Sequence, residues 1–297
     1  MSARPGPAWR SLLYVPANVE RFVERAHVAG ADAIVLDLED AVAPSEKASA
    51  RKSVAAAAAL VSRGGADVVV RINRPLSLAV DDIFASVGPH VGTLALPKVA
   101  GPDHLRLLSE TVAEAELRSG VAVGETRFLV MIETAAAALD VARIALAEPR
   151  VAALVLGTED LATDLGVDPA AEVLLPLHTA LVAAAVAAGV LPLGLVGSIA
   201  EFRDLDAFGE IARRSRAFGY RGAACIHPAQ IPALHAAFTP DPREVERARR
   251  IVAAYDAALA SGLGAISLDG RMIDIPIANR ARALLASYEA LTSHSAR

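Results

Sequence analysis

The chain has 297 residues, of which 54% are hydrophobic and 21% charged, so it is long enough to bury a large core within one barrel domain. Its formal net charge of −5 excludes the broad basic field by which proteins collect nucleic acid, although local arginines can still bind an anion. The single cysteine, Cys225, excludes an internal disulfide, and no long apolar run lies between Met1 and Trp9. We therefore expect a cytoplasmic protein without a signal peptide.

Short apolar runs alternate with longer segments rich in Ala, Leu, Glu and Arg, which predicts parallel strands joined by helices. Eight such runs favour a (β/α)₈ barrel. A doubly wound open sheet is the alternative, weakened because no GxGxxG loop follows the first run. The predicted strands are Ser11–Val15, Ala33–Leu36, Val68–Ile72, Thr93–Leu96, Phe128–Ile132, Ala153–Leu156, Leu191–Val196 and Ala223–Ile226. The predicted helices include Val19–Ala29, Ser45–Ser62, Asp103–Ser119, Ala171–Ala188 and Glu201–Phe218.

One uncharged stretch, Val173 to Ala200, is long enough to span a bilayer. Gly189 and Pro192 divide it into an Ala-rich first half and a short apolar second half. Because parallel strands buried on both faces are continuously apolar, the stretch favours a helix followed by a buried strand over a membrane span.

About seventy residues follow the last predicted strand, which is more than one barrel helix requires. We therefore divide the chain into a catalytic barrel, residues 1–239, and a C-terminal helical extension, residues 240–297. The extension is predicted to hold a long charged helix over Arg243–Ser261, a loop or short hairpin over Gly262–Pro276, and a final helix over Ile277–Leu291. It either caps the barrel or forms an arm that reaches an active site.

Polar side chains gather where the predicted strands end, and barrel enzymes place their chemistry at those ends. Neighbouring carboxylates repel one another unless a cation joins them, and oxygen ligands favour Mg²⁺. Glu133 and Asp160 follow adjacent strands and are placed to share one ion; the alternative is that each carboxylate caps a following helix. The polar residues at these ends are Asp37, Glu39, Asp40, Arg71, Lys98, Glu133, Glu159, Asp160 and His227.

Blocks of sequence along nearly the whole chain resemble the citrate lyase β-subunit-like family, in the family's order. This family includes malyl-CoA and citramalyl-CoA lyases and is more distantly similar to the HpcH/HpaI class II aldolases. The blocks are RSLLYVPA at Arg10–Ala17, GADAIVLDLEDAVAPSEKASAR at Gly30–Arg51, VRIN at Val70–Asn73, LPK at Leu96–Lys98, IET at Ile132–Thr134, GTEDLATDLG at Gly157–Gly166, IHPAQI at Ile226–Ile231 and GRMIDIPIANRA at Gly270–Ala281.

The resemblance implies roles for individual residues. Glu133 and Asp160 correspond to the ligands of a Mg²⁺ cofactor, and Arg71 to a substrate-binding and catalytic arginine. Glu39 and Asp40 stand where the family has carboxylates that hold metal-bound water. Asp274 corresponds to an acid–base residue on a lid segment that closes over a neighbouring subunit's site, which implies a homotrimer or hexamer with exchanged arms.

Three further residues, Arg10, Lys98 and His227, are candidates for substrate binding, although His227 is equally suited to ordering the turn before Pro228. Small departures from the family pattern, such as Tyr14 in place of Phe, leave the thioester carrier and the acyl group open.

The predicted function is Mg²⁺-dependent cleavage of a 3-hydroxy-acyl-CoA thioester, such as malyl-CoA or citramalyl-CoA, to an oxo acid and acetyl-CoA or propionyl-CoA. Alternatives are a citrate lyase β subunit acting on an acyl-carrier thioester, a class II pyruvate aldolase, a Schiff-base aldolase using Lys98, and a non-catalytic assembly subunit. No nucleic acid or membrane partner is expected.

Overall fold

The computed structural model describes residues 6–199 and 203–295. The chain divides into two compact units, Met1–Phe238 and Thr239–Arg297, which are described one at a time.

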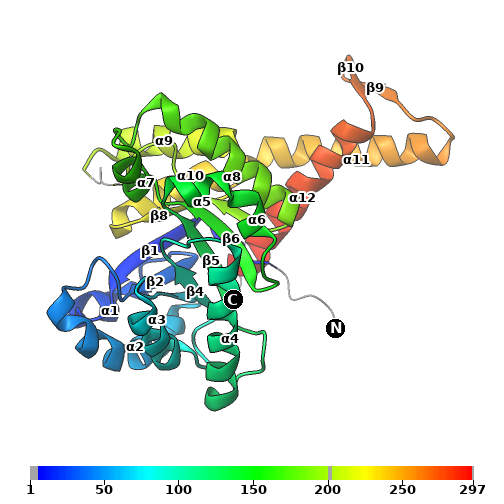
Figure 1. Cartoon of the computed structure of the whole chain (residues 1–297). Coiled ribbons are helices and arrows are strands. Elements are labelled where there is room, and N and C mark those ends of the chain that lie inside the picture. The colour runs from blue at the N-terminus through cyan, green and yellow to red at the C-terminus, as the bar shows by residue number, and fades with distance from the viewer. Residues whose placement is uncertain (1–5, 200–202, 296–297) are drawn as a thin grey trace. The chain divides into compact units, whose positions relative to one another are not determined.

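The first unit is built on eight parallel strands that follow one another around a nearly closed barrel (Figure 1). β1 pairs with both β2 and β8, and the remaining strands pair in chain order up to β7. This order confirms the predicted (β/α)₈ barrel, and the doubly wound alternative is wrong. The strands are β1 Ser11–Pro16, β2 Ala33–Asp37, β3 Asp67–Arg71, β4 Thr93–Leu96, β5 Arg127–Ile132, β6 Val151–Leu156, β7 Leu191–Leu193 and β8 Ala223–Cys225.

The barrel closes at β7 and β8 through a single bridge between Leu193 and Gly222, next to a 3.0 Å hydrogen bond from Gly194 N to Gly222 O. A Cβ on Gly222 would lie 1.9 Å from the backbone oxygen of Trp9. Glycine at this position therefore allows β8 to approach the chain that leads into β1.

Helices surround the strands, as the alternation of the sequence predicts. The long predicted helices are confirmed, but five helices lie outside the predicted ranges: α3, α5, α6, α7 and α10. Glu201, the first residue of one predicted helix, lies outside the described residues. The helices of this unit are α1 Glu20–Ala26, α2 Lys47–Val61, α3 Leu76–Ser86, α4 Pro102–Ser119, α5 Ala135–Leu139, α6 Val141–Ala145, α7 Thr158–Leu165, α8 Leu175–Ala188, α9 Leu205–Phe218 and α10 Ile231–Phe238, with short 3₁₀ turns η1 Pro44–Glu46, η2 Ser62–Gly64, η3 Glu172–Leu174 and η4 Pro228–Gln230.

The core has two layers because the strands are buried on both faces. Alternate residues such as Ala33 and Val35 join a cluster with Trp9 and Leu12, whereas Ile34 belongs to the larger cluster that includes residues of the helices. Period-two burial on both faces explains why each strand is a continuous apolar run in the sequence.

The uncharged stretch after Val173 forms α8 and then β7, as predicted up to residue 199. Gly189 ends α8 with a left-handed φ of 68°. In the part of the chain that the structure describes, no helix has both the length and the apolar character that a membrane span requires.

The second unit is a pair of helices with a hairpin between them. α11 (Pro242–Ala260) and α12 (Ile275–Ser295) flank β9 (Ile266–Leu268) and β10 (Arg271–Ile273), so the predicted helix, hairpin and helix are present. Asp269 and Gly270 form the turn with positive φ values of 52° and 74°, which suits a two-residue hairpin. The unit has its own small core, which contains Ala248, Ile251, Tyr255, Ile273, Ala278 and Ala281.

Candidate active site

A cavity of about 210 Å³ lies in the first unit, lined by residues near the C-terminal ends of the barrel strands. These ends carry the chemistry of barrel enzymes. The polar groups that line it include Tyr14 from β1, Asp37 from β2, Arg71 from β3, Glu133 after β5, and Glu159 and Asp160 from the first turn of α7.

Arg71 is held by two hydrogen bonds to Asp37, the last residue of the neighbouring strand. Its Nε and Nη2 atoms lie 2.8 and 2.6 Å from the two Asp37 carboxylate oxygens. Burial opposes the charge of Arg71, but the bonds to Asp37 and the nearby negative charges raise its pKa above the ordinary value. The remaining nitrogen, Nη1, lies 2.9 Å from Glu39 Oε2, and the guanidinium carbon lies 5.1 Å from the centre of the Tyr14 ring. Arg71 is therefore a fixed, permanently charged group at the cavity.

Glu39 is 5% exposed, and burial raises its pKa despite the opposing charge of Arg71. Its Oε1 accepts a hydrogen bond from Lys98 Nζ at 3.1 Å. Its Oε2 is buried and has no hydrogen-bond partner in the structure, because the short contact with Arg71 Nη1 lacks hydrogen-bond geometry. A buried carboxylate oxygen left without a donor is costly unless water or a ligand meets it.

Lys98 follows β4 with a positive φ of 46°, an uncommon conformation for a residue with a side chain. Its ammonium lies 3.4 Å from Asp40 Oδ2 and 3.3 Å from Asp160 Oδ1, in addition to its contact with Glu39. Burial works against this charge, but the charge of Glu39, its hydrogen bond and the other carboxylates raise the Lys98 pKa. Lys98 is thus a cation between three carboxylates. A backbone conformation of this kind costs free energy, so the surrounding contacts hold Lys98 in it.

Glu133 is 2% exposed at the end of β5. Its Oε2 accepts a 2.7 Å hydrogen bond from the Lys98 backbone N–H. Burial, opposed by that bond and reinforced by Asp160, raises the pKa of Glu133 to about 7. A Cβ on Gly157 would lie 2.4 Å from Glu133 Cγ, so the glycine leaves the space that this side chain occupies.

Glu133 and Asp160 fit a magnesium site by their chemistry and position. Both side chains are hard oxygen donors that line one cavity. The ammonium of Lys98, 3.3 Å from Asp160 Oδ1, partly compensates their negative charge. Within residues 6–199 and 203–295, no three or more His, Cys, Asp or Glu side chains are arranged to hold a metal. A pair of carboxylates completed by water and substrate oxygens suits Mg²⁺, which keeps much of its hydration.

Two of the predicted substrate-binding residues lie apart from these groups. Arg10 precedes β1, at the opposite end of the strand, and its Nη2 pairs with Asp32 Oδ1 at 2.7 Å. His227 is exposed after β8, and its Nδ1 accepts a hydrogen bond from Ala229 N, which orders the 3₁₀ turn η4. The structure thus brings together Glu39, Asp40, Arg71, Lys98, Glu133 and Asp160, and does not bring Arg10 to the cavity.

Asp274 belongs to the second unit, so its predicted role at the site stays a prediction. It directly precedes α12, and its Oδ1 accepts a 3.3 Å hydrogen bond from Ile277 N. In this position it caps the first turn of the helix.

Four polar residues of the cavity lining had no predicted role at the site: Tyr14, Asp37, Thr158 and Glu159. Asp37 also accepts hydrogen bonds from the backbone N–H groups of Glu39 and Ala41, at 2.9 and 3.1 Å, and so shapes the turn that presents Glu39. Its position as a charged residue closing a wholly apolar strand was a usable signal. Tyr14 gave none, because an aromatic residue within a strand is ordinarily part of the core.

Comparisons with known proteins agree with the resemblance seen in the sequence. The model of the HpcH/HpaI aldolase/citrate lyase family matches residues 10–228. The chain is 32% identical over 279 residues to a citrate lyase subunit beta of Leuconostoc mesenteroides subsp. cremoris, covering 93% of this chain and 92% of that protein. It is 32% identical over 290 residues to a (3S)-malyl-CoA thioesterase of Cereibacter sphaeroides, covering 97% of each.

The fold is also similar to that of a solved structure, CitE from Mycobacterium tuberculosis in complex with magnesium, acetoacetate and coenzyme A. The TM-score is 0.72 at 26% identity, and the match covers 96% of this chain and 98% of that one. The chain therefore belongs to the HpcH/HpaI aldolase/citrate lyase family and is an enzyme of the lyase type.

Proposed function

We propose that the protein is a magnesium-dependent carbon–carbon lyase that cleaves a 3-hydroxy-acyl-CoA thioester into an oxo acid and acetyl-CoA or propionyl-CoA. The observation that carries this proposal is the convergence of Arg71, Glu133 and Asp160 on one cavity at the strand ends. The relatives named for malyl-CoA and citrate lyase and the CitE complex with magnesium and coenzyme A support it.

Glu133 and Asp160 would hold the Mg²⁺, which supplies Lewis-acid stabilisation of the oxo-acid oxygens. Water held by Glu39 and Asp40 would relay the proton of the substrate's 3-hydroxyl to one of these two carboxylates, and the C2–C3 bond breaks to give a carbonyl and a thioester enolate. Arg71, fixed by Asp37, stabilises the negative charge that develops. Asp274 then donates a proton to C2, which completes the acyl-CoA product.

Lys98 argues against the Schiff-base alternative. A lysine attacks a carbonyl only as the neutral amine. Glu39, Asp40 and Asp160 surround its ammonium and raise its pKa, so they hold it in the protonated form. We propose that Lys98 positions the carboxylates and does not form an imine.

A second candidate function is hydrolysis of the same thioester, because one of the similar proteins is named a (3S)-malyl-CoA thioesterase. The two reactions share a substrate but break different bonds. Cleavage of C2–C3 yields an oxo acid with the thioester intact, whereas hydrolysis yields a free thiol and an unbroken hydroxy acid.

The test incubates the purified chain with Mg²⁺ and malyl-CoA, citramalyl-CoA, β-methylmalyl-CoA or 3-hydroxy-3-methylglutaryl-CoA. Oxo acid is followed as its phenylhydrazone and free CoA with a thiol reagent, with EDTA as a control. The lyase proposal expects oxo acid without free thiol, lost in EDTA. Glu133→Gln should abolish the signal, and the exposed Glu114→Gln should keep it.

Free thiol without oxo acid would replace the lyase with a thioesterase. No product from any CoA ester, in a chain that binds Mg²⁺, would contradict the CoA proposal and favour an acyl-carrier thioester, as expected of a citrate lyase β subunit. No product and no Mg²⁺ binding would favour an assembly subunit.

We further propose that residues 240–297 act as a lid on the site of a neighbouring subunit, in a homotrimer or hexamer. The support is the resemblance of Gly270–Ala281 to the family's lid segment, with Asp274 as its acid–base residue.

A further inference from the structure

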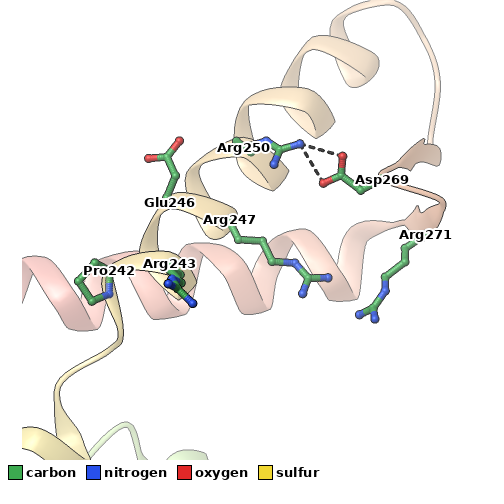
Figure 2. Close-up of a pocket in the computed structure, with 7 residues that line it drawn as sticks. All are labelled: Pro242, Arg243, Glu246, Arg247, Arg250, Asp269 and Arg271. Carbon is green, nitrogen blue, oxygen red and sulfur yellow. Dashed lines mark hydrogen bonds and ion pairs between the residues drawn. The ribbon is translucent and has the colours of Figure 1, made fainter.

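A second cavity lies within the second unit, and charged side chains dominate its walls. Its volume is about 570 Å³, and it is bordered by the first half of α11 and by the β9–β10 hairpin (Figure 2). Four arginines against two carboxylates give the lining a net charge of +2, within a chain whose formal charge is −5. The charged residues are Arg243, Glu246, Arg247, Arg250, Asp269 and Arg271.

One arginine of this cavity has a structural partner. Arg250 Nη2 lies 2.8 Å from each carboxylate oxygen of Asp269, in the turn of the hairpin. This ion pair adds to the apolar packing between the hairpin and α11, which places Arg271, two residues further on, beside the cavity. Arg250 and Asp269 are therefore positioning residues.

The other three arginines have no such partner. Within residues 6–199 and 203–295, Arg243, Arg247 and Arg271 form no ion pair, and all three side chains are exposed to solvent. Figure 2 shows Arg247 extending from α11 toward the hairpin that carries Arg271. Three guanidinium groups thus face one open cavity.

The placement of these arginines is locally unfavourable for the helix. Arg243 and Arg247 are four residues apart on α11, a spacing at which like charges repel. Arg243 also stands in the first turn, where the helix dipole disfavours a cation. The stability of α11 therefore gives no reason for this cluster, and a bound anion would relieve both penalties.

We propose that this cavity binds a polyphosphate-bearing anion. The planar guanidinium fork matches phosphate oxygens, often with two parallel hydrogen bonds. A single carboxylate would engage one fork, whereas neighbouring phosphates engage Arg243, Arg247 and Arg271 together within the 570 Å³ available. The site is lined only by residues of the second unit, and binding of a polyphosphate there does not depend on the proposed lyase reaction. Its ligand comes either from the nucleotide end of a CoA ester or from a free polyphosphate.

The test is calorimetric titration of the full chain with inorganic tripolyphosphate in Mg²⁺-free buffer. We expect one site per chain, with affinity falling as NaCl is added. Arg247→Gln and Arg271→Gln should each weaken binding about tenfold, since each removes a charge-assisted contact. Glu246→Gln should tighten binding, because it removes a negative charge from the lining; improved binding cannot result from misfolding. Arg280→Gln, an exposed position of α12 outside the cavity lining, should bind as the wild type does.

Loss of binding in Arg280→Gln equal to that in Arg247→Gln would overturn the proposal. Unchanged binding in Arg247→Gln and Arg271→Gln, or no binding by the wild type, would also overturn it. Two further titrations then identify the source. Competition of CoA with tripolyphosphate, weakened when dephospho-CoA replaces CoA, assigns the site to the nucleotide end of CoA. Tripolyphosphate and ATP binding without competition from CoA assigns it to a free polyphosphate.

Discussion

At the scale of single residues, the burial of Glu133 affects the pH at which this side chain can bind a metal ion. Its carboxyl group is 2% exposed, and burial raises its pKa to about 7. The Lys98 N–H supplies one hydrogen bond to it at 2.7 Å, which is too little to offset the desolvation of a charged carboxylate. A proton and a divalent cation therefore compete for this side chain near neutral pH.

The first prediction concerns the pH dependence of Mg²⁺ binding. Only the ionised Glu133 binds the metal, so apparent affinity should fall about tenfold between pH 8 and pH 6. Titration of the chain with Mg²⁺ at both values, by calorimetry, measures this change. Glu114→Gln should reproduce it. An affinity independent of pH over this range would show that Glu133 is not a ligand.

The second prediction concerns the stability of the metal-free protein. Because the folded pKa of Glu133 lies above the unfolded value, its contribution is fully present below about pH 4.5 and is lost as pH rises through about 7. In this window, the group lowers the free energy of unfolding by about 1.4 kcal/mol per pH unit. Urea unfolding between pH 5 and pH 8 should show a shallower decline in Glu133→Gln than in the wild type; parallel curves would contradict the burial argument.

The third prediction separates the charge of Arg71 from its geometry. Arg71→Lys keeps a cation but cannot make the two-point contact with Asp37 seen at 2.8 and 2.6 Å. We expect a loss of about 1–3 kcal/mol in the free energy of unfolding, and a fall in kcat of about a hundredfold or more. Steady-state kinetics with the best substrate of the panel tests this, and a change in KM alone would assign Arg71 to substrate binding only.

At the scale of elements, the connection from β6 to α7 sets the shape of the candidate metal site. Gly157 is the residue between them, and its backbone φ of −81° is open to any residue. The constraint on it is therefore spatial: a Cβ would meet Glu133 Cγ at 2.4 Å. Because Gly157 has no side chain, Glu133 can occupy the space beside it. The first turn of α7 then brings Asp160 to the same cavity.

The fourth prediction follows from this contact. Gly157→Ala should displace Glu133 and weaken Mg²⁺ binding at least tenfold, because metal sites tolerate little displacement of a ligand. Gly92→Ala, where a Cβ would meet nothing within 4 Å, is the matched control. The Mg²⁺ affinity of both variants is measured by calorimetric titration, and equal affinities would show that Glu133 is not a metal ligand.

The elements themselves differ in how far the sequence predicts them. The strands are apolar runs, and all eight are present at the predicted places, although β7 ends at Leu193, three residues before the predicted end. The long helices follow from composition. The short helices α5 and α6, of five residues each, are too brief to show periodicity. Helix α7 begins at Thr158, so its first turn contains the glutamate–aspartate pair that we interpreted as a strand-end motif.

At the scale of the whole molecule, the predicted acid–base residue and the predicted metal ligands lie in different units. Asp274 precedes α12, whereas Glu133 and Asp160 follow β5 and β6. The proposed exchange of arms would build each site from two subunits, and this can be tested by mixing two variants.

The fifth prediction uses two inactive variants, Asp274→Asn and Glu133→Gln. In an assembly with exchanged arms, a site that pairs the intact barrel of the first variant with the intact arm of the second is complete. Equal mixing after reversible dissociation should restore about a quarter of wild-type activity, since each half of a site is then intact in half the subunits.

No recovery of activity, with mixed assemblies demonstrated by differential tagging, would show that Asp274 acts within its own chain or has no catalytic role. Asp274→Asn alone should keep its Mg²⁺ affinity; a loss of affinity would assign Asp274 to the metal site instead.

The sequence by itself determined the barrel and the family. Eight apolar runs with helices between them leave few other folds, and the blocks from Arg10 to Ile231 identify relatives because residues at strand ends are set by shared chemistry. It also placed Glu39, Arg71, Glu133 and Asp160 in one neighbourhood, since parallel strands bring their C-terminal ends to one face.

Only the tertiary structure decided which partners these residues have. The two-point contact of Asp37 with Arg71, the position of Lys98 among three carboxylates and the structural pairing of Arg10 with Asp32 all depend on distances between different strands and the loops that follow them. The arginine cavity of the second unit likewise depends on the packing of the hairpin against α11, through their shared apolar cluster and the Arg250–Asp269 ion pair. The spacing of residues along a chain fixes the face they share with near neighbours, but contacts across the fold follow from how the elements pack.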